Sequence, residues 1–151
     1  MKGYWNDEAA TTASFRDGWF HSGDIGYLDA DGFLHVVDRM KDVVIRGGEN
    51  VYCAEVEAVL HEHPAVAEVA IVGLEERAMG ERVCAVVVLR PGAALDLADL
   101  RAFASERLAR FKCPEALCVT EELPKTATGK IAKATVRREV EDAAGDIERA
   151  W

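Results

Sequence analysis

Two runs rich in β-branched residues, Val66 to Val72 and Val83 to Leu89, constrain the fold of this chain more than any other feature. Apolar runs without polar alternation are typical of strands that are covered on both faces. Gly73, Gly80 and Pro91 flank the runs, so that turn-forming residues bound each strand. The sequence therefore predicts a buried sheet with other elements packed on both sides.

Segments with helical spacing alternate with these strands. A short amphipathic helix is expected from Cys53 until Pro64, and a longer one between Asp96, a good N-cap, and Phe111. Ala116 to Val119 is a short strand candidate, and a basic helix is expected from about Lys133 to Asp142. This alternation predicts a small α/β or α+β structure with about three core strands and about three helices.

The segment before Cys53 has the pattern of a β-hairpin. Ile25 to Leu28 and Phe33 to Val37 are apolar runs on either side of Asp29-Ala30-Asp31-Gly32, a turn in which glycine can adopt a positive φ. A further apolar run, Val43 to Ile45, is broken by Gly47-Gly48.

Met1 to Phe20 is polar and irregular, with no sustained strand or helix period. Its aromatic residues, Tyr4, Trp5, Trp19 and Phe20, look like docking groups without a visible partner. We expect this segment to be disordered by itself or to pack on another molecule, either a partner domain or a second copy of the chain in a homo-oligomer.

Charge and hydropathy exclude several classes of protein. With 27 acidic and 18 basic residues among 151, and a formal net charge of -9, the chain would repel a nucleic-acid backbone. The longest apolar run, Val83 to Leu89, is far shorter than the roughly 20 residues of a membrane span, and no signal-peptide pattern opens the sequence. We expect a soluble, cytoplasmic protein with no nucleic-acid partner and no membrane span.

Cysteine and histidine spacings do not favour a metal site. His61 and His63 point in different directions on a helix, so that they cannot comfortably share one tetrahedral ion. The cysteines form no C-x-x-C pair and are interpreted as buried, reduced thiols: Cys53, Cys84, Cys113 and Cys118.

Three polar clusters, at residues 22–26, 38–50 and 124–130, combine charge with glycine, as loops that approach a ligand do. Taken singly they are weak signals, because an Asp–Arg pair is usually a surface ion pair worth about 0 to 1 kcal/mol. Lys130 ends a Thr-Gly-Lys sequence, but the earlier glycine of a P-loop is missing.

Taken together and in order, these clusters belong to a series of motifs. The motifs are GYW at 3–5, GWFHSGDIG at 18–26, DR at 38–39, RGGENV at 46–51, AEVE at 54–57 and PKTATGK at 124–130. The chain thereby resembles the C-terminal portion of an adenylate-forming acyl-CoA ligase. The match covers nearly the whole chain, and it is specific because motif order and spacing agree together.

The resemblance implies an enzyme that uses Mg2+ and ATP to convert a carboxylic acid to an acyl-adenylate and pyrophosphate, then transfers the acyl group to coenzyme A. Residues 1–38 would form the tail of the N-terminal AMP-binding domain, and residues 39–151 the C-terminal domain. The implied fold is α+β, a small mobile lid with a two-stranded hairpin and a roughly three-stranded sheet flanked by about three helices.

The resemblance also implies roles for three charged residues. Asp24 would accept hydrogen bonds from the ribose hydroxyls of ATP, and Arg39 would support the ribose and phosphates as a planar cation. Lys130 would enter the site during adenylation, where its charge offsets negative charge that develops on the carboxylate and phosphate oxygens.

Four further residues have positions that the resemblance assigns. Lys41 falls at the hinge between the domains, where many relatives carry Asp and a few torsions absorb the rotation. Gly47, Gly48 and Glu49 resemble the loop that lines the pantetheine tunnel, where glycine lets the backbone approach the ligand. No residue of this chain is expected to bind a metal.

The phosphate loop, adenine-binding segment and acyl pocket of such ligases belong to the N-terminal domain. We therefore expect the isolated chain to be inactive and to need that domain in cis or in trans, and the acid stays open between fatty and aromatic acids. Two alternatives are a stand-alone, non-catalytic binding or regulatory module with the lid fold, and the lid of another adenylate-forming enzyme.

Overall fold

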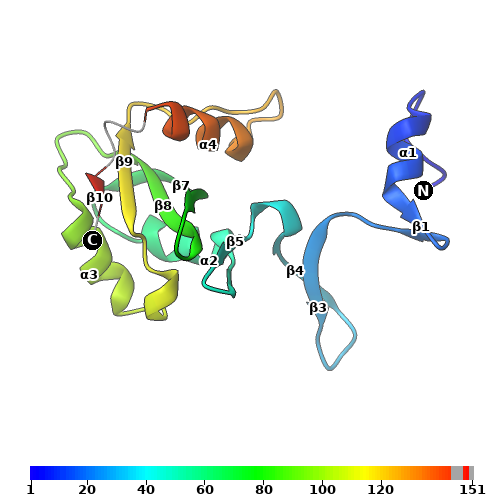
Figure 1. Ribbon diagram of the computed structural model, residues 1–151, viewed down its shortest axis with the longest axis horizontal. Helices are drawn as coiled ribbons and strands as arrows, with labels where there is room; N and C mark the ends of the chain where they lie inside the picture. Colours follow the sequence, from blue (N-terminus) through cyan, green and yellow to red (C-terminus); the bar gives the residue numbers. More distant parts are fainter. Residues whose placement is uncertain (144–147, 150–151) are drawn as a thin grey trace. The chain divides into compact units, whose positions relative to one another are not determined.

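The computed structural model describes residues 1–143 and 148–149. The chain divides into two compact units, Met1–Lys41 and Asp42–Trp151. Each unit has its own helices and strands (Figure 1).

The two β-branched runs are buried strands, as predicted, and the structure pairs them with each other as the central hairpin of the second unit. β7 (Val66–Glu76) and β8 (Gly80–Leu89) pair antiparallel along almost their whole length. β9 (Ala116–Thr120) pairs parallel with β8. The strands of the hairpin are longer than the apolar runs, because β-pairing continues through the polar residues on both sides of the turn.

Helices cover both faces of this sheet, which explains why its strands are apolar throughout (Figure 1). On one face, Ile71 belongs to a core cluster with Leu60 and Leu100 of two helices. On the other face, Val72 belongs to a second cluster with Val136 of a third helix. Adjacent strand residues thus point into separate cores, as the two-residue repeat of a strand requires.

The expected helices are present, with one correction. α2 is Cys53–His61 and α4 is Lys133–Asp142, close to the predicted bounds. α3 covers only Leu97–Ser105 and is followed by a separate 3-10 turn, η2 (Arg110–Lys112). The prediction of one helix reaching Phe111 is therefore wrong.

The last turn after the helix has the tighter hydrogen bonds of a 3-10 turn. The Arg107 N–H donates to the Ala104 carbonyl three residues back, at 3.0 Å, and the Leu108 N–H donates to the same carbonyl at 2.8 Å. Leu108 still reaches the core from the turn that follows, so that apolar spacing alone could not reveal the break.

Short strands complete the sheet. β5 (Val44–Arg46) and β6 (Glu49–Val51) form a small antiparallel hairpin, and β5 also pairs with β8 at Arg46 and Gly80. β10 (Glu148–Arg149) pairs with β9. β6 and β10 were not predicted, because two or three residues are too few to show a strand period.

The first unit contains the predicted hairpin, formed by β3 (Asp24–Leu28) and β4 (Leu34–Arg39). The side chain of Asp29 closes its turn, since Oδ1 accepts the N–H groups of Asp31 at 3.0 Å and Phe33 at 2.9 Å. This hairpin places the two ends of its strands, and so the polar residues at 24 and 39, side by side.

The structure also contains regular elements in the segment predicted to be irregular. These are α1 (Glu8–Ser14), β1 (Phe15–Arg16) and β2 (Trp19–Phe20). Asp7 caps α1, and elements this short leave no detectable period in a sequence. Trp5 and Trp19 are 97% and 77% exposed, and their role in docking stays a prediction.

The fold class is α+β, as predicted. Within the described residues, no helix is long and apolar enough to cross a membrane. Within the described residues no cysteine forms a disulfide; Cys53, Cys84 and Cys113 are buried and Cys118 is half-buried. Burial raises the pKa of the Cys113 thiol, which favours the inert, protonated form.

Candidate functional site

Asp24 and Arg39 face each other across the β3–β4 hairpin. The two residues are paired in register, and Arg39 Nε donates to Asp24 Oδ1 at 3.2 Å. Both side chains are exposed, so that their ion pair contributes little stability. A carboxylate that accepts from hydroxyl groups and a guanidinium that donates to phosphate oxygens are therefore presented together.

The backbone holds this end of the hairpin in place. The Met40 N–H donates to the Gly23 carbonyl at 2.8 Å. Asp38 is buried, and its Oδ1 accepts the N–H of Arg39 at 2.8 Å. Asp38 thus orders the backbone that carries Arg39, a role that its place in a charged sequence segment does not reveal.

Lys41 lies in a 3-10 turn, η1 (Met40–Asp42), and is the last residue of the first unit. Its side chain is exposed. The residue predicted to act as a hinge therefore stands where one unit ends and the next begins, and its role in a rotation stays a prediction.

Gly47 and Gly48 form the two-residue turn between β5 and β6, with φ of +57° and +85°. Positive φ at both positions is the geometry of a type I′ hairpin turn, for which glycine has no Cβ penalty. The Gly47 N–H donates to the Met79 carbonyl at 2.7 Å. Glu49 follows at the start of β6 and is exposed, as are both glycines.

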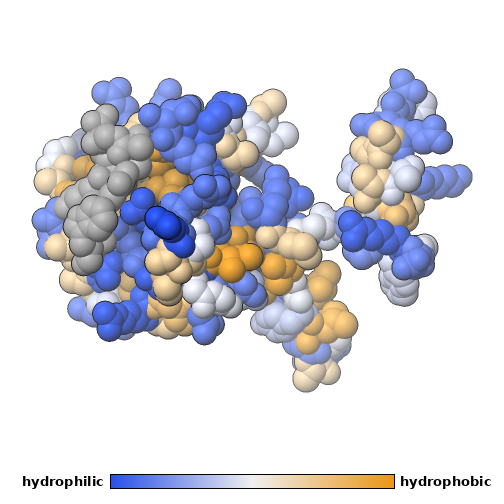
Figure 2. Space-filling view, in the orientation of Figure 1, coloured by the Kyte–Doolittle hydropathy of each residue, from blue (hydrophilic) through white to orange (hydrophobic). Residues whose placement is uncertain are grey.

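Apolar side chains are exposed close to this glycine turn. Ile45 precedes it in β5, and Met79 contacts it through the hydrogen bond to Gly47. Figure 2 shows a hydrophobic surface gathered over β5. Apolar surface beside a few polar groups is typical of small-molecule sites.

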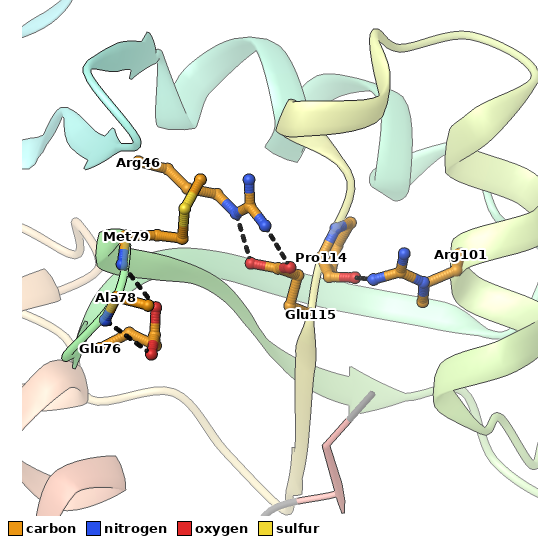
Figure 3. A network of polar contacts seen from close by, with 7 residues as sticks. All are labelled: Arg46, Glu76, Ala78, Met79, Arg101, Pro114 and Glu115. Carbon is orange, nitrogen blue, oxygen red and sulfur yellow. Dashed lines mark hydrogen bonds and ion pairs between the residues drawn. The ribbon is translucent and has the colours of Figure 1, made fainter. Parts of the chain in front are cut away.

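Charged side chains support the glycine turn from outside it (Figure 3). Arg46 donates through Nε and Nη2 to both carboxylate oxygens of Glu115, at 2.5 and 2.6 Å. The hydrogen bond to Glu115 raises the pKa of Arg46 above its ordinary value, so that Arg46 stays charged. The two residues are 69 positions apart, and no local pattern of the sequence could have paired them.

Glu76 shapes the neighbouring turn between β7 and β8. Its carboxylate accepts the N–H groups of Ala78 at 3.0 Å and Met79 at 2.7 Å (Figure 3). These two hydrogen bonds lower the pKa of Glu76. Glu76, which the motif series does not include, therefore fixes the backbone of Met79, whose carbonyl accepts the Gly47 N–H.

Lys130 ends a loop that is held by its own hydrogen bonds. The Thr126 N–H donates to the Lys130 carbonyl at 2.7 Å, and the Lys130 N–H donates to Thr126 Oγ1 at 3.2 Å. Gly129 has a φ of +80°, and its N–H donates to the Thr126 carbonyl at 2.9 Å. Thr126 thus organises the backbone on both sides of the glycine.

The two lysines of this loop have different surroundings. Lys125 forms an ion pair with Glu68 of β7, with N–O distances of 2.9 and 3.0 Å. Lys130 is exposed, and no carboxylate of the described residues forms an ion pair with it. Its ammonium group is therefore available to an anionic ligand.

The predicted site residues lie on separate elements. Asp24 and Arg39 share one hairpin of the first unit, whereas the glycine turn and Lys130 lie on different loops of the second. Across residues 1–143 and 148–149, no group of three or more His, Cys, Asp or Glu is arranged to hold a metal ion.

Residues 55–130 match the family of AMP-binding enzyme C-terminal domains. The chain belongs to this family, whose members are lid domains of the adenylate-forming ANL superfamily. The match runs from α2 to Lys130, so that it includes the central sheet and the whole PKTATGK loop.

Curated relatives are acyl-CoA ligases. The long-chain-fatty-acid–CoA ligase of Bacillus subtilis (strain 168) is 48% identical over 139 residues, which cover 92% of this chain and 25% of that protein. The 2-succinylbenzoate–CoA ligase of Geobacillus kaustophilus is 50% identical over 137 residues, which cover 91% and 28%. The chain spans about a quarter of the length of the curated relatives it matches.

Solved structures of the same superfamily share the fold. The o-succinylbenzoate CoA synthetase of Bacillus subtilis, in complex with an acyl-adenylate intermediate, has a TM-score of 0.83 and 44% identity, covering 91% of this chain and 28% of that one. ATP-bound MatB from Rhodopseudomonas palustris has a TM-score of 0.84 and 39% identity, covering 93% and 28%. The resemblance to acyl-CoA ligases and the lid fold are therefore confirmed.

Proposed function

We propose that this chain is the C-terminal, lid portion of an acyl-CoA ligase. Such an enzyme joins a carboxylic acid to ATP and then transfers the acyl group to coenzyme A. The proposal rests above all on Lys130, the exposed lysine at the end of the family match that has no carboxylate partner among the described residues. The relatives' names range from long-chain fatty acids to 2-succinylbenzoate, so that the class of reaction is common to them and the acid differs.

In the first half-reaction, an oxygen of the carboxylate attacks the α-phosphorus of ATP, and the bond to pyrophosphate breaks. Negative charge grows on the oxygens around that phosphorus. Lys130 supplies a positive charge there on a long, flexible side chain that can enter and leave. The self-contained loop that carries Lys130 supports this role, because the lysine projects from a fixed backbone.

Asp24 and Arg39 hold the nucleotide in the same step. The Asp24 carboxylate accepts hydrogen bonds from ribose hydroxyls, and Arg39 donates toward the ribose and phosphate oxygens. Their pairing across one hairpin supports a joint role. Binding fixes the nucleotide in position, which lowers the entropic part of the barrier.

In the second half-reaction, the sulfur of coenzyme A attacks the acyl carbon, and the carbon–oxygen bond to AMP breaks. Gly47, Gly48 and Glu49 line the path of the pantetheine arm toward that carbon. The type I′ turn supports this role at Gly48, where nothing lies within 4 Å of the place that a Cβ would take, so that a narrow ligand can pass close to the backbone. Lys41 acts as the hinge of a rotation between the half-reactions, in which the glycine turn replaces the Lys130 loop at the reacting centre.

The partner in this reaction is the N-terminal AMP-binding domain, in cis or in trans. We assign to it the acyl pocket, most of the ATP contacts and Mg2+. The exposed aromatic side chains of the first unit support such a partner, because Tyr4, Trp5 and Trp19 leave large apolar surfaces uncovered within the described part of the chain.

A fusion tests the proposal. The full chain would replace the matching portion of the Geobacillus 2-succinylbenzoate–CoA ligase, and pyrophosphate and acyl-CoA would be measured with 2-succinylbenzoate, Mg2+, ATP and coenzyme A. We expect both products from the fusion and neither from the chain alone. Products from the chain alone, or a fusion that works equally well with Lys130→Ala, would contradict the proposal.

The accepting thiol separates the alternatives. Acyl transfer by the fusion to free coenzyme A supports an acyl-CoA ligase. Transfer only to the thiol of a carrier protein would favour the lid of another adenylate-forming enzyme, and a fusion without any adenylation would favour a non-catalytic module.

A further inference from the structure

The glycine turn at Gly47 and Gly48 has few contacts of its own. β5 and β6 pair at only three positions, from Val44 with Val51 to Arg46 with Glu49. A two-stranded ribbon this short is not stable by itself. The direction in which the turn projects therefore depends on contacts from other parts of the second unit.

Arg46 provides the contact at the base of the turn. Its bidentate pair with Glu115 joins β5 to the residue just before β9 (Figure 3). Both side chains are largely removed from solvent, with 20% and 25% exposed. Two parallel charge-assisted hydrogen bonds fix the orientation of the planar groups as well as their distance.

Glu115 is itself anchored in the core of the unit. Its N–H donates to the Val83 carbonyl of β8 at 2.8 Å. The preceding residue, Pro114, is buried, and its carbonyl accepts a hydrogen bond from Arg101 of α3 at 2.7 Å (Figure 3). The carboxylate that binds Arg46 is therefore attached to the central sheet and to a covering helix.

The opposite side of the turn rests on the β7–β8 connection. Gly47 donates to the carbonyl of Met79, and Arg46 pairs in register with Gly80. The Met79 N–H in turn donates a hydrogen bond to the Glu76 carboxylate at 2.7 Å. The turn is thus held from two sides, and Arg46 is the residue that belongs to both contacts.

We propose that Arg46 is a positioning residue for the acyl-transfer half-reaction. Its pair with Glu115 sets the direction of the Gly47–Glu49 turn, along which the thiol of coenzyme A approaches. The inference rests on the proposed function of that turn. Because adenylation uses Lys130 on a separate loop, loss of the pair slows the two half-reactions unequally.

The test measures both half-reactions in the fusion of the full chain with the upstream portion of the Geobacillus ligase. Arg46→Gln and Glu115→Gln remove the pair from either side. We expect each to lower the rate of acyl transfer to coenzyme A about 10- to 100-fold, the scale of a misplacement near 1 Å. Pyrophosphate release without coenzyme A should stay unchanged.

Three further variants separate positioning from general damage. The double variant Arg46→Gln/Glu115→Gln should be no slower than either single one, because the residues act as a unit. Exchanging the charges, with Arg46→Glu and Glu115→Arg, should restore part of the rate. As a matched control, Lys133→Gln removes the 2.8 Å ion pair between α4 and Glu57 of α2 and should change neither half-reaction.

Amide hydrogen exchange in the full chain alone provides a readout that needs no activity. Arg46→Gln should speed exchange at Gly47, whereas Lys133→Gln should not. Unchanged exchange at Gly47, equal losses in both half-reactions, or an effect of Arg46→Gln that Glu115→Gln does not share would each overturn the positioning role. A fusion that never forms acyl-CoA would instead overturn the proposed function, and faster exchange would still support the contact.

Discussion

The loop that carries Lys130 and the turn at Gly47 and Gly48 are both exposed, glycine-containing and assigned to ligand contact, yet they are held in different ways. Thr126 organises the Lys130 loop through hydrogen bonds within seven residues of sequence. The glycine turn depends on Met79 and on the Arg46–Glu115 pair, which come from distant parts of the sequence.

This difference determines where each loop is sensitive to substitution. A self-contained loop keeps its shape as long as its own residues are present. A loop held from outside is altered by changes in residues that never touch a ligand. The residues that hold the Lys130 loop in shape therefore lie almost entirely within its own motif, whereas part of what holds the glycine turn lies outside its motif.

The largest expected effect is that of Lys130→Ala in the fusion enzyme. Loss of a preorganised charge at the reacting centre should slow pyrophosphate release about 100- to 1000-fold. The free energy of unfolding should not change, because Lys130 is exposed and forms no ion pair in the described part of the chain. Stopped-time pyrophosphate assays and thermal unfolding of the same variant check both statements.

Lys125→Ala is the matched control from the same loop. Lys125 pairs with Glu68 at the surface, so that its loss should cost about 0 to 1 kcal/mol of stability. Its pyrophosphate release should remain near that of the unsubstituted fusion. If Lys125→Ala were as slow as Lys130→Ala, the loop as a whole, and not one ammonium group, would matter.

Substituting the two glycines compares the supports of the two loops. Gly47→Ala and Gly129→Ala both place a Cβ at positive φ, which costs about 1 to 2 kcal/mol. At Gly47 the Cβ would also lie 2.5 Å from Met79 Cε, whereas nothing lies within 4 Å at Gly129. Met79 Cε is the end of a flexible side chain and can move away, so urea unfolding should show similar losses for the two variants. A much larger loss for Gly47→Ala would mean that the Met79 side chain is itself held in place.

Thr126→Val should loosen the Lys130 loop without removing its lysine. The Lys130 N–H loses its acceptor at Thr126 Oγ1, which is worth about 0.5 to 1.5 kcal/mol. We expect a modestly slower release of pyrophosphate and unchanged acyl transfer. Thr128→Val removes only the contact between the two hydroxyls and should have the smaller effect; the reverse order would break the proposed role of Thr126.

The smallest effect is a pH dependence at the β7–β8 turn. Hydrogen bonds from Ala78 and Met79 lower the pKa of Glu76 below its ordinary value of 4.5. A lowered carboxyl pKa stabilises the folded turn above the ordinary value, and this stabilisation is lost as the pH falls through the folded-state pKa. The amide NMR signals of Ala78 and Met79 should therefore shift together on acidification, and Glu76→Gln should abolish that shift.

Much of the fold could be predicted because its signals are local. The β-branched runs became β7 and β8, and the spacing from Cys53 and from Lys133 became α2 and α4. The early end of α3 could not be predicted, because Leu108 remains apolar and buried outside the helix. The short strands and α1 lack enough residues for a period.

The candidate site also has a part that local sequence signals predict and a part that they do not. Motif order identified Asp24, Arg39, the glycine turn and Lys130, and hairpin register brought the first two together. Glu115, Glu76 and Met79 belong to none of the motifs, since nothing in their neighbouring residues marks them. They hold the glycine turn only through contacts that form once the strands have assembled.

The sequence by itself determined the α+β class, the buried strands and the family, because alternating apolar periods and an ordered set of motifs are properties of neighbouring residues. Only the tertiary structure decided which charges pair, which lysine of the Lys130 loop has no ion pair with any described residue, and what holds the glycine turn. Those outcomes depend on hydrogen bonds between residues as far apart as Arg46 and Glu115, whose geometry exists only once the strands have assembled.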